Sequence, residues 1–189
     1  MNERRKGYEK IMRDYNVTSK GCFYHRHVEN HKDMFDECEN FKGWVRSELD
    51  CVKGLNNDIE YHVERLHELN HIRDNSPDKP WDRFFALPTK DNFPTIYEFL
   101  EQNKNMYKDG MICKFGPGCK LKPHIHGKYA PPYIYNMSIN FPKGCKFTVL
   151  PDGNIPYKSG DIYKLYVNNM HSVENNSDEN RYHIVLQAV

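Results

Sequence analysis

Residues 118–127 read GCKLKPHIHG, a short stretch that contains two closely spaced histidines. It places His124 and His126 two positions apart in a region whose neighbouring segments read as β-strands. In an extended strand the side-chain period is two, so both imidazoles point to the same face. Two imidazoles on one face are a suitable start for a transition-metal site. A third histidine, His171, comes 47 residues after His124, and Arg181 follows it by ten.

The composition is that of an ordinary globular protein. Among 189 residues, 27 basic and 26 acidic side chains leave a formal net charge of +1, which implies no nucleic-acid or acidic-lipid partner. Aromatic residues make up 13% of the chain, too many for a disordered protein. There is no long apolar run and no signal-peptide pattern, so we expect a cytoplasmic protein that does not engage a membrane. The six cysteines are scattered without a CxxC motif and are expected to be free thiols.

The hydrophobic pattern of the first part of the chain is helical. Apolar residues recur at steps of three and four, which predicts helices at residues 33–53 and 58–73 and a further helix that begins at Pro94. Residues 16–32 and 74–93 read as irregular segments between them.

The pattern changes near residue 110. After it, six or seven short strands, each ending in turn residues, indicate a sandwich or a barrel. We therefore expect one structural domain, in which residues 1–110 are mainly helical and pack on a barrel formed by residues 111–189.

One predicted strand shows a clear alternation that suggests how the barrel wall is oriented. One face of residues 133–141 carries bulky side chains: Tyr133, Tyr135, Met137, Ile139 and Phe141. The other face is smaller and more polar: Ile134, Asn136, Ser138 and Asn140. Such a strand suits a wall with helices outside and a wet pocket inside, although the opposite orientation also fits the pattern.

His171 and Arg181 flank a loop of turn-forming residues, 174–180. A hairpin there would place the two side chains on one face, about 5 Å apart. An arginine inside a barrel is costly unless it meets an anion, and its planar fork binds a carboxylate bidentately. The spacing therefore predicts a metal that binds a small organic acid, whose far carboxylate contacts the guanidinium of Arg181. A surface hairpin with an exposed Arg181 fits the same spacing equally well.

Together these residues resemble the Fe(II) and 2-oxoglutarate-dependent oxygenases, and more narrowly the aspartyl/asparaginyl β-hydroxylase family. The matching motifs are GPGCKLKPH at residues 116–124, PKGC at residues 142–145, Gly160 with Asp161, and His171 with Asn175, Asp178 and Arg181. They cover roughly residues 111–189. The resemblance implies an α+β fold, a double-stranded β-helix (a jelly-roll or cupin-like barrel) backed by N-terminal helices.

The resemblance also implies roles for the site residues. His124 and His171 would bind Fe(II), Arg181 would hold the distal carboxylate of the co-substrate 2-oxoglutarate, and O2 would be the oxidant. The chain would then be a 2-oxoglutarate-dependent dioxygenase that hydroxylates an amino-acid residue or a small amino acid. Its partner would be a peptide, a protein or a small amino-acid substrate.

Two features depart from the pattern of such oxygenases. His126 stands where many of them carry a carboxylate. The β-hydroxylase family resembled here lacks that carboxylate too, so His126 could be a third ligand, a hydrogen-bond donor around the metal, or a bystander. The family also has an arginine and a histidine on the strand before the Pro-Gly turn, where this chain has Ile134 and Asn136. Asn136 could contact the co-substrate, with Ser138 or a nearby tyrosine as substitutes.

Two other hypotheses use the same residues. Gly118, His124 and His126, with His171 further on, also resemble the cupin motif, which would give a three-histidine metalloprotein that does not use 2-oxoglutarate. The glutamate expected soon after the second histidine is missing from residues 128–131, and Arg181 would have no task. The other hypothesis is a metal-free jelly roll that serves in binding or assembly.

Overall fold

The computed structural model describes residues 18–46, 83–126 and 131–189. Within these ranges the helices are α2 (His31–Asn40) and α5 (Pro94–Gln102). The strands in chain order are β1 (Cys22–His27), β2 (Val45–Arg46), β3 (Arg83–Ala86), β4 (Tyr107–Phe115), β5 (Lys120–His124), β6 (Ile134–Ser138), β7 (Cys145–Val149), β8 (Gly153–Asn154), β9 (Asp161–Leu165), β10 (His171–Asn175) and β11 (Arg181–Ala188).

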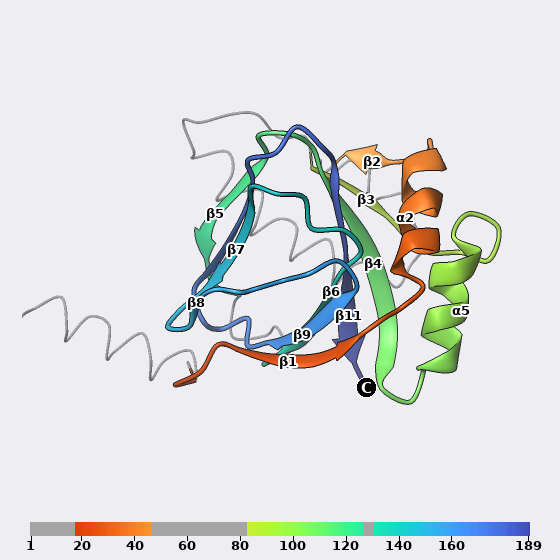
Figure 1. Cartoon of the computed structure of the whole chain (residues 1–189). Coiled ribbons are helices and arrows are strands. Elements are labelled where there is room, and N and C mark those ends of the chain that lie inside the picture. Colours follow the sequence, from red (N-terminus) through yellow and green to blue (C-terminus); the bar gives the residue numbers. More distant parts are fainter. Residues whose placement is uncertain (1–17, 47–82, 127–130) are drawn as a thin grey trace, which may run out of the picture.

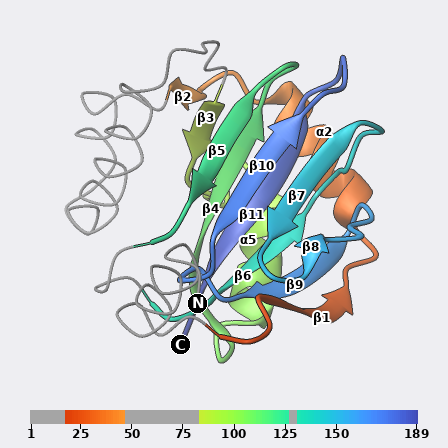
Figure 2. The ribbon, with the colours of Figure 1, turned by 90° about the vertical axis from the view of Figure 1, so that its left-hand side faces the viewer.

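The strands form two antiparallel sheets that face each other (Figure 1). The larger sheet has the order β1-β9-β6-β11-β4-β3-β2, and the smaller has the order β5-β10-β7-β8. From β4 onward the chain passes back and forth between the sheets, apart from the β7–β8 hairpin within the smaller one (Figure 2). This alternation defines a double-stranded β-helix, so the predicted barrel with helices behind it is confirmed.

Hydrophobic cores lie on both faces of the larger sheet. One core lies between this sheet and the helices, which cover its outer face (Figure 1), and it includes Met34 of α2 and Ile96 of α5. The other fills the interior between the sheets and includes Phe115 of β4, Phe147 of β7 and Val173 of β10. The barrel interior is therefore an enclosed, mostly apolar space.

Alternate residues of β6 and β11 point to opposite faces of the larger sheet. Met137 and Ile184 belong to the core beneath the helices. Asn136 and His183, each one position away along its strand, line a pocket inside the barrel. Of the two orientations open for residues 133–141, β6 has its bulky face against the helices and its polar face toward the interior.

The helices before residue 110 are only partly as predicted. Helix α5 begins at Pro94, as expected for a residue that suits the first helical turn. The helix predicted at residues 33–53 is shorter, since α2 ends at Asn40 and Phe41 is already extended with φ −72° and ψ 133°. No helix in the described ranges has the length and apolar character needed to cross a membrane.

The irregular structure predicted at residues 16–32 and 74–93 is wrong in part, because β1 and β3 lie there. Strand β1 pairs with β9, and β3 pairs with β4. A strand that gains its partner from a distant part of the chain is set by that pairing more than by local pattern. The helix expected at residues 58–73 lies outside the described residues, and the division at residue 110 stays a prediction.

The hairpin expected between His171 and Arg181 is not formed. Strand β10, with His171, lies between β5 and β7 in the smaller sheet. Strand β11, with Arg181, lies between β4 and β6 in the larger sheet. The segment 176–180 is thus a crossover between sheets, and the predicted cross-strand spacing of about 5 Å is wrong. Both side chains remain buried in the barrel, because the two sheets face each other.

Asn175 ties this crossover to the turn after β4. Its side-chain nitrogen donates to the carbonyl oxygens of Phe115, Gly116 and Glu179 at 2.9, 3.0 and 2.8 Å. Its side-chain oxygen accepts from the Cys145 thiol of β7 at 3.1 Å. One fully buried amide therefore joins β4, β7 and the crossover.

We expect Asn175→Ala to lower the free energy of unfolding by about 3 kcal/mol, because it leaves buried carbonyl groups without donors. Chemical denaturation followed by circular dichroism measures this change. The neighbouring exposed residue provides a control: Asn176→Ala should cost about 0.5 kcal/mol or less. Equal effects of the two substitutions would contradict the structural role given to Asn175.

Candidate active site

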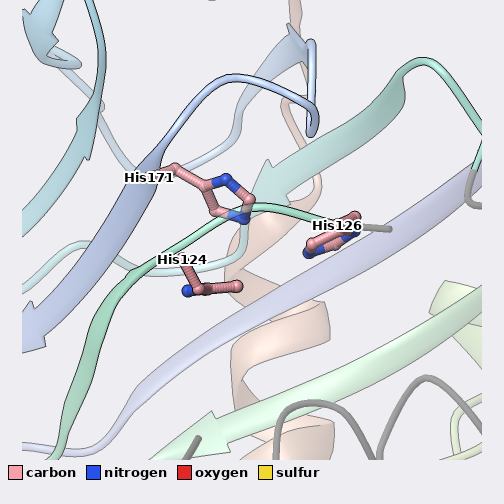
Figure 3. Close-up of side chains that lie close together, drawn as sticks. All are labelled: His124, His126 and His171. Carbon is pink, nitrogen blue, oxygen red and sulfur yellow. The ribbon is translucent and has the colours of Figure 1, made fainter. Parts of the chain in front are cut away.

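Three buried histidines meet inside the barrel (Figure 3). His124 ends β5, His126 follows two residues later, and His171 begins β10 directly opposite His124. The ring centroids lie 4.3 Å apart for His124 and His171, 4.9 Å for His126 and His171, and 5.5 Å for His124 and His126. One nitrogen from each ring lies within 4.8 Å of the others, so the trio could hold one transition-metal ion.

The turn before β10 orients His171. Its Nδ1 lies 2.8 Å from the backbone oxygen of Asn169. A carbonyl oxygen only accepts, so Nδ1 carries the proton and Nε2 carries the lone pair, which is the form of imidazole that binds a metal. Asn169 is itself held by its side-chain nitrogen, which donates to the backbone oxygens of Thr18 and Leu150.

The trio opens into a pocket with an apolar wall. Its apolar residues are Met111, Phe115, Leu121, Ile134, Phe147, Val173 and Val185. Besides the three histidines, its polar residues are Arg83, Asn136, His183 and Gln187. No aspartate or glutamate of the described chain lines it. In a mostly apolar pocket without acids in its described lining, an anion interacts strongly with a buried cation.

Arg181 is fully buried in the barrel interior. Its guanidinium carbon lies 5.2 Å from the ring centroid of Phe141 and 5.7 Å from that of Phe147. The Phe147 ring also faces His171, with 6.2 Å between centroids, so one phenyl ring separates Arg181 from the histidine trio. None of the three guanidinium nitrogens has a hydrogen-bond partner within the described ranges. The exposed position that the spacing also allowed for Arg181 is therefore wrong.

The two weaker candidates of β6 have different surroundings. Asn136 lines the pocket, and its side-chain oxygen accepts from the Tyr157 hydroxyl at 2.9 Å. Ser138 is fully buried, and its hydroxyl donates to the backbone oxygen of Asn140 at 3.0 Å. Asn136 is therefore the candidate with direct access to a ligand in the pocket.

Arg83 and His183 line the same pocket, and the sequence reasoning missed both. Arg83 lies in a segment expected to be irregular, so its local pattern carried no signal. His183 stands two positions after Arg181 on β11, and strand alternation could have placed it on the same inner face. Both are buried, with 7% and 4% of their surface exposed.

Burial also shifts the titration of these groups. It lowers the pKa of both guanidiniums, although arginine stays protonated in proteins. Burial, and then the positive charges of Arg181 and Arg83, hold the pKa of His183 well below its usual value. His183 is therefore neutral at pH 7, and its buried Nδ1 has no hydrogen-bond partner within the described ranges.

Comparisons with known proteins agree with this geometry. Residues 45–189 match the family described as Aspartyl/Asparaginyl beta-hydroxylase. One similar solved structure is a prolyl hydroxylase from Trichoplax adhaerens in complex with a hypoxia inducible factor oxygen degradation domain peptide fragment. It is 12% identical, with 98% of this chain and 91% of that chain covered and a TM-score of 0.58.

A second similar structure is the non-haem α-ketoglutarate-dependent epimerase SnoN from nogalamycin biosynthesis. It is 13% identical, with 96% of this chain and 82% of that chain covered and a TM-score of 0.50. At these identities both likenesses show the shared fold. The comparison with curated proteins gave no match.

A double-stranded β-helix that encloses clustered imidazoles and an arginine without a hydrogen-bond partner in the described ranges fits the class of Fe(II) and 2-oxoglutarate-dependent oxygenases. Since the family match extends over most of the chain, the protein belongs to the aspartyl/asparaginyl β-hydroxylase family. It is accordingly a 2-oxoglutarate-dependent hydroxylase, with Fe(II), 2-oxoglutarate and O2 as its cofactor, co-substrate and oxidant.

The depressed pKa of His183 predicts that acid destabilises the metal-free protein. Below about pH 6.5 the unfolded chain binds a proton at this residue and the folded chain does not, so the free energy of unfolding falls as the pH falls. The contribution of one such group is about 1.4 kcal/mol per pH unit. We expect His183→Gln to make the decline between pH 6.5 and 5 shallower by about this amount, as measured by denaturation at a series of pH values. Identical slopes for the two proteins would contradict a neutral His183.

Proposed function

We propose that this enzyme hydroxylates a carbon of an amino-acid residue or of a small amino acid. Support for this substrate class comes from the family match, whose description names aspartyl and asparaginyl groups. The single observation that carries the proposed site is the buried histidine trio, one phenyl ring away from an arginine that has no hydrogen-bond partner among the described residues. A metal ion would bind to the histidine trio, and one end of a dicarboxylate would bind to the arginine.

His124, His171 and His126 would hold the iron. The chemistry of these donors fits, because imidazole suits iron and all three rings are buried together. Iron(II), when bound, supplies the activation of O2 that couples oxidation of 2-oxoglutarate to succinate and CO2 with insertion of oxygen into a C–H bond. The hydrogen bond from His171 to Asn169 keeps one ligand in the right tautomer.

Arg181 would hold the distal carboxylate of 2-oxoglutarate. Its guanidinium is a buried cation, and within the described ranges it faces no carboxylate, so an anionic ligand would remove the cost of its burial. Asn136 lines the pocket next to the histidine trio and would contact the co-substrate, with Ser138 a further candidate on the same strand. The apolar wall would keep water away from the reacting carbon.

The three-histidine geometry alone would also suit the cupin hypothesis, in which 2-oxoglutarate has no role. The family match favours the oxygenase, and so does the buried Arg181, whose guanidinium has no hydrogen-bond partner in the part of the chain that the structure describes. Binding of 2-oxoglutarate to the iron-loaded protein separates the two hypotheses, since only the oxygenase requires it.

Anaerobic titration of the Fe(II)-loaded protein with 2-oxoglutarate should produce a metal-to-ligand charge-transfer band. We expect Arg181→Met to raise the dissociation constant of 2-oxoglutarate about 100-fold, because the variant removes a buried charge-assisted contact. Lys146→Met is a matched control, since Lys146 is exposed on neighbouring β7 and should leave the titration unchanged. Tight iron binding without any response to 2-oxoglutarate would contradict the proposal.

The role of His126 can be tested separately. We expect His124→Ala and His171→Ala to abolish Fe(II) binding. We expect His126→Ala to weaken it at least tenfold, because a nitrogen of the third ring lies within 4.8 Å of a nitrogen of each of the other two. His126→Asp should restore binding, because a carboxylate is the usual third ligand of such sites. Isothermal titration calorimetry measures these affinities, and an unchanged affinity in His126→Ala would assign His126 no ligand role.

A further inference from the structure

A second buried arginine, Arg83 on β3, lines the pocket and has no role in the chemistry described so far. Its guanidinium carbon lies 4.6 Å from the ring centroid of Phe85 and 5.4 Å from that of Phe115. Among the described residues its Nε has no hydrogen-bond partner, and the Cys113 thiol, a weak acceptor, is a partner of the guanidinium. No carboxylate of the described chain pairs with it. A buried cation kept in this state is costly unless a ligand supplies the missing charge.

Arg83 and Arg181 flank Phe115 on opposite sides. Both are paired in register with Phe115 of β4, Arg83 from β3 and Arg181 from β11. From there their side chains diverge: Arg83 stays over Phe85 and Phe115 of the larger sheet, whereas Arg181 reaches Phe147 of the smaller sheet. The two guanidiniums therefore offer two anion positions on different walls.

The charges inside the barrel leave room for a second anion. The pocket wall has no acid within the described ranges, and the metal ligands would be three neutral histidines. The combined charge of iron and two guanidiniums then exceeds that of the co-substrate dianion. One carboxylate of 2-oxoglutarate would bind the iron and the other would bind Arg181. The guanidinium of Arg83 would then be left to bind an anionic group of a second molecule.

We propose that Arg83 binds a carboxylate of the substrate, so that the enzyme acts on an acidic substrate. This inference rests on the proposed function and narrows its substrate class. Arg83 lines the same pocket as the histidine trio, so a carboxylate on its fork holds the neighbouring carbon atoms of the substrate inside that pocket. The carboxylate is either the side chain of an aspartyl or glutamyl residue or the terminal group of a small amino acid.

His183 complements this position. Its ring packs on Phe115 with 5.3 Å between centroids, so Arg83 and His183 approach the same phenyl ring. Its Nδ1, which has no hydrogen-bond partner among the described residues, is a group that a carboxylate or its bound water can satisfy without adding charge. The proposed carboxylate site then consists of the charged guanidinium of Arg83 and the neutral imidazole of His183.

The test measures binding of two matched pairs of probes to the full chain loaded with Zn(II) and N-oxalylglycine, a non-reacting isostere of 2-oxoglutarate. N-acetyl-aspartate N-methylamide and its asparagine analogue compare a side-chain acid with an amide. N-acetylglycine and N-acetylglycinamide compare a terminal acid with an amide. By calorimetry we expect the acid of one pair to bind at least tenfold tighter than its amide. The pair that shows this preference tells whether Arg83 binds a side-chain or a terminal carboxylate of the substrate.

Arg83→Met should reduce this preference to less than threefold and change the affinity for N-oxalylglycine less than threefold. Arg83→Lys keeps the charge without the fork and should retain part of the preference, which provides a second variant if the first does not fold. Arg26→Met is the matched control, because Arg26 also stacks on two aromatic rings, Phe99 and Tyr107, and does not line the pocket.

Three results would overturn the inference: no acid preference in the wild type, a preference that survives in Arg83→Met, or a tenfold loss of N-oxalylglycine binding in that variant. The last result would assign Arg83 to the co-substrate. A wild-type protein that binds neither Zn(II) nor N-oxalylglycine would instead contradict the proposed function. A protein that binds both and prefers no acid contradicts only the role of Arg83.

Discussion

The constraint on which this structure depends is positive charge that is buried without a counter-charge from any residue the structure describes. Arg181 and Arg83 are buried inside the barrel, and the pocket that Arg83 lines has no aspartate or glutamate among the described residues. Two such guanidiniums weaken the folded state unless anions reach them, because burial removes their hydration and the aromatic rings around them replace only part of it. The presence of both arginines in the interior therefore indicates that the fold binds anionic ligands. The co-substrate of this family is a dianion, and it suits one of the two guanidiniums.

The crossover connections of the barrel are what bring the charged and metal-binding groups together. His171 and Arg181 are ten residues apart, yet they belong to opposite sheets and meet across the interior on either side of Phe147. Asn175, between them in the chain, fixes the point where the chain leaves the smaller sheet. The segment between His171 and Arg181 therefore contains a crossover from one sheet to the other. The distance between the two side chains depends on the separation of the sheets.

Much of this could be predicted from local pattern. The alternation of β6, the proline that opens α5 and the paired histidines after Gly118 each express a period or a backbone preference that a few neighbouring residues determine. Strands β1 and β3 could not be predicted, because their hydrogen-bond partners come from distant segments. Arg83 was missed for the same reason, since its inward direction follows from the pairing of β3 with β4.

By itself, the sequence determined the residue types of the site, the spacing of His124, His171 and Arg181, and the family to which these belong. Those features depend on the order of side chains along the chain, which the sequence contains completely. Only the tertiary structure decided that His126 joins the other two rings and that Arg83 lies in the same pocket. The physical reason is that burial and the direction of a side chain are properties of packed sheets, and the packing depends on contacts between residues far apart in the chain.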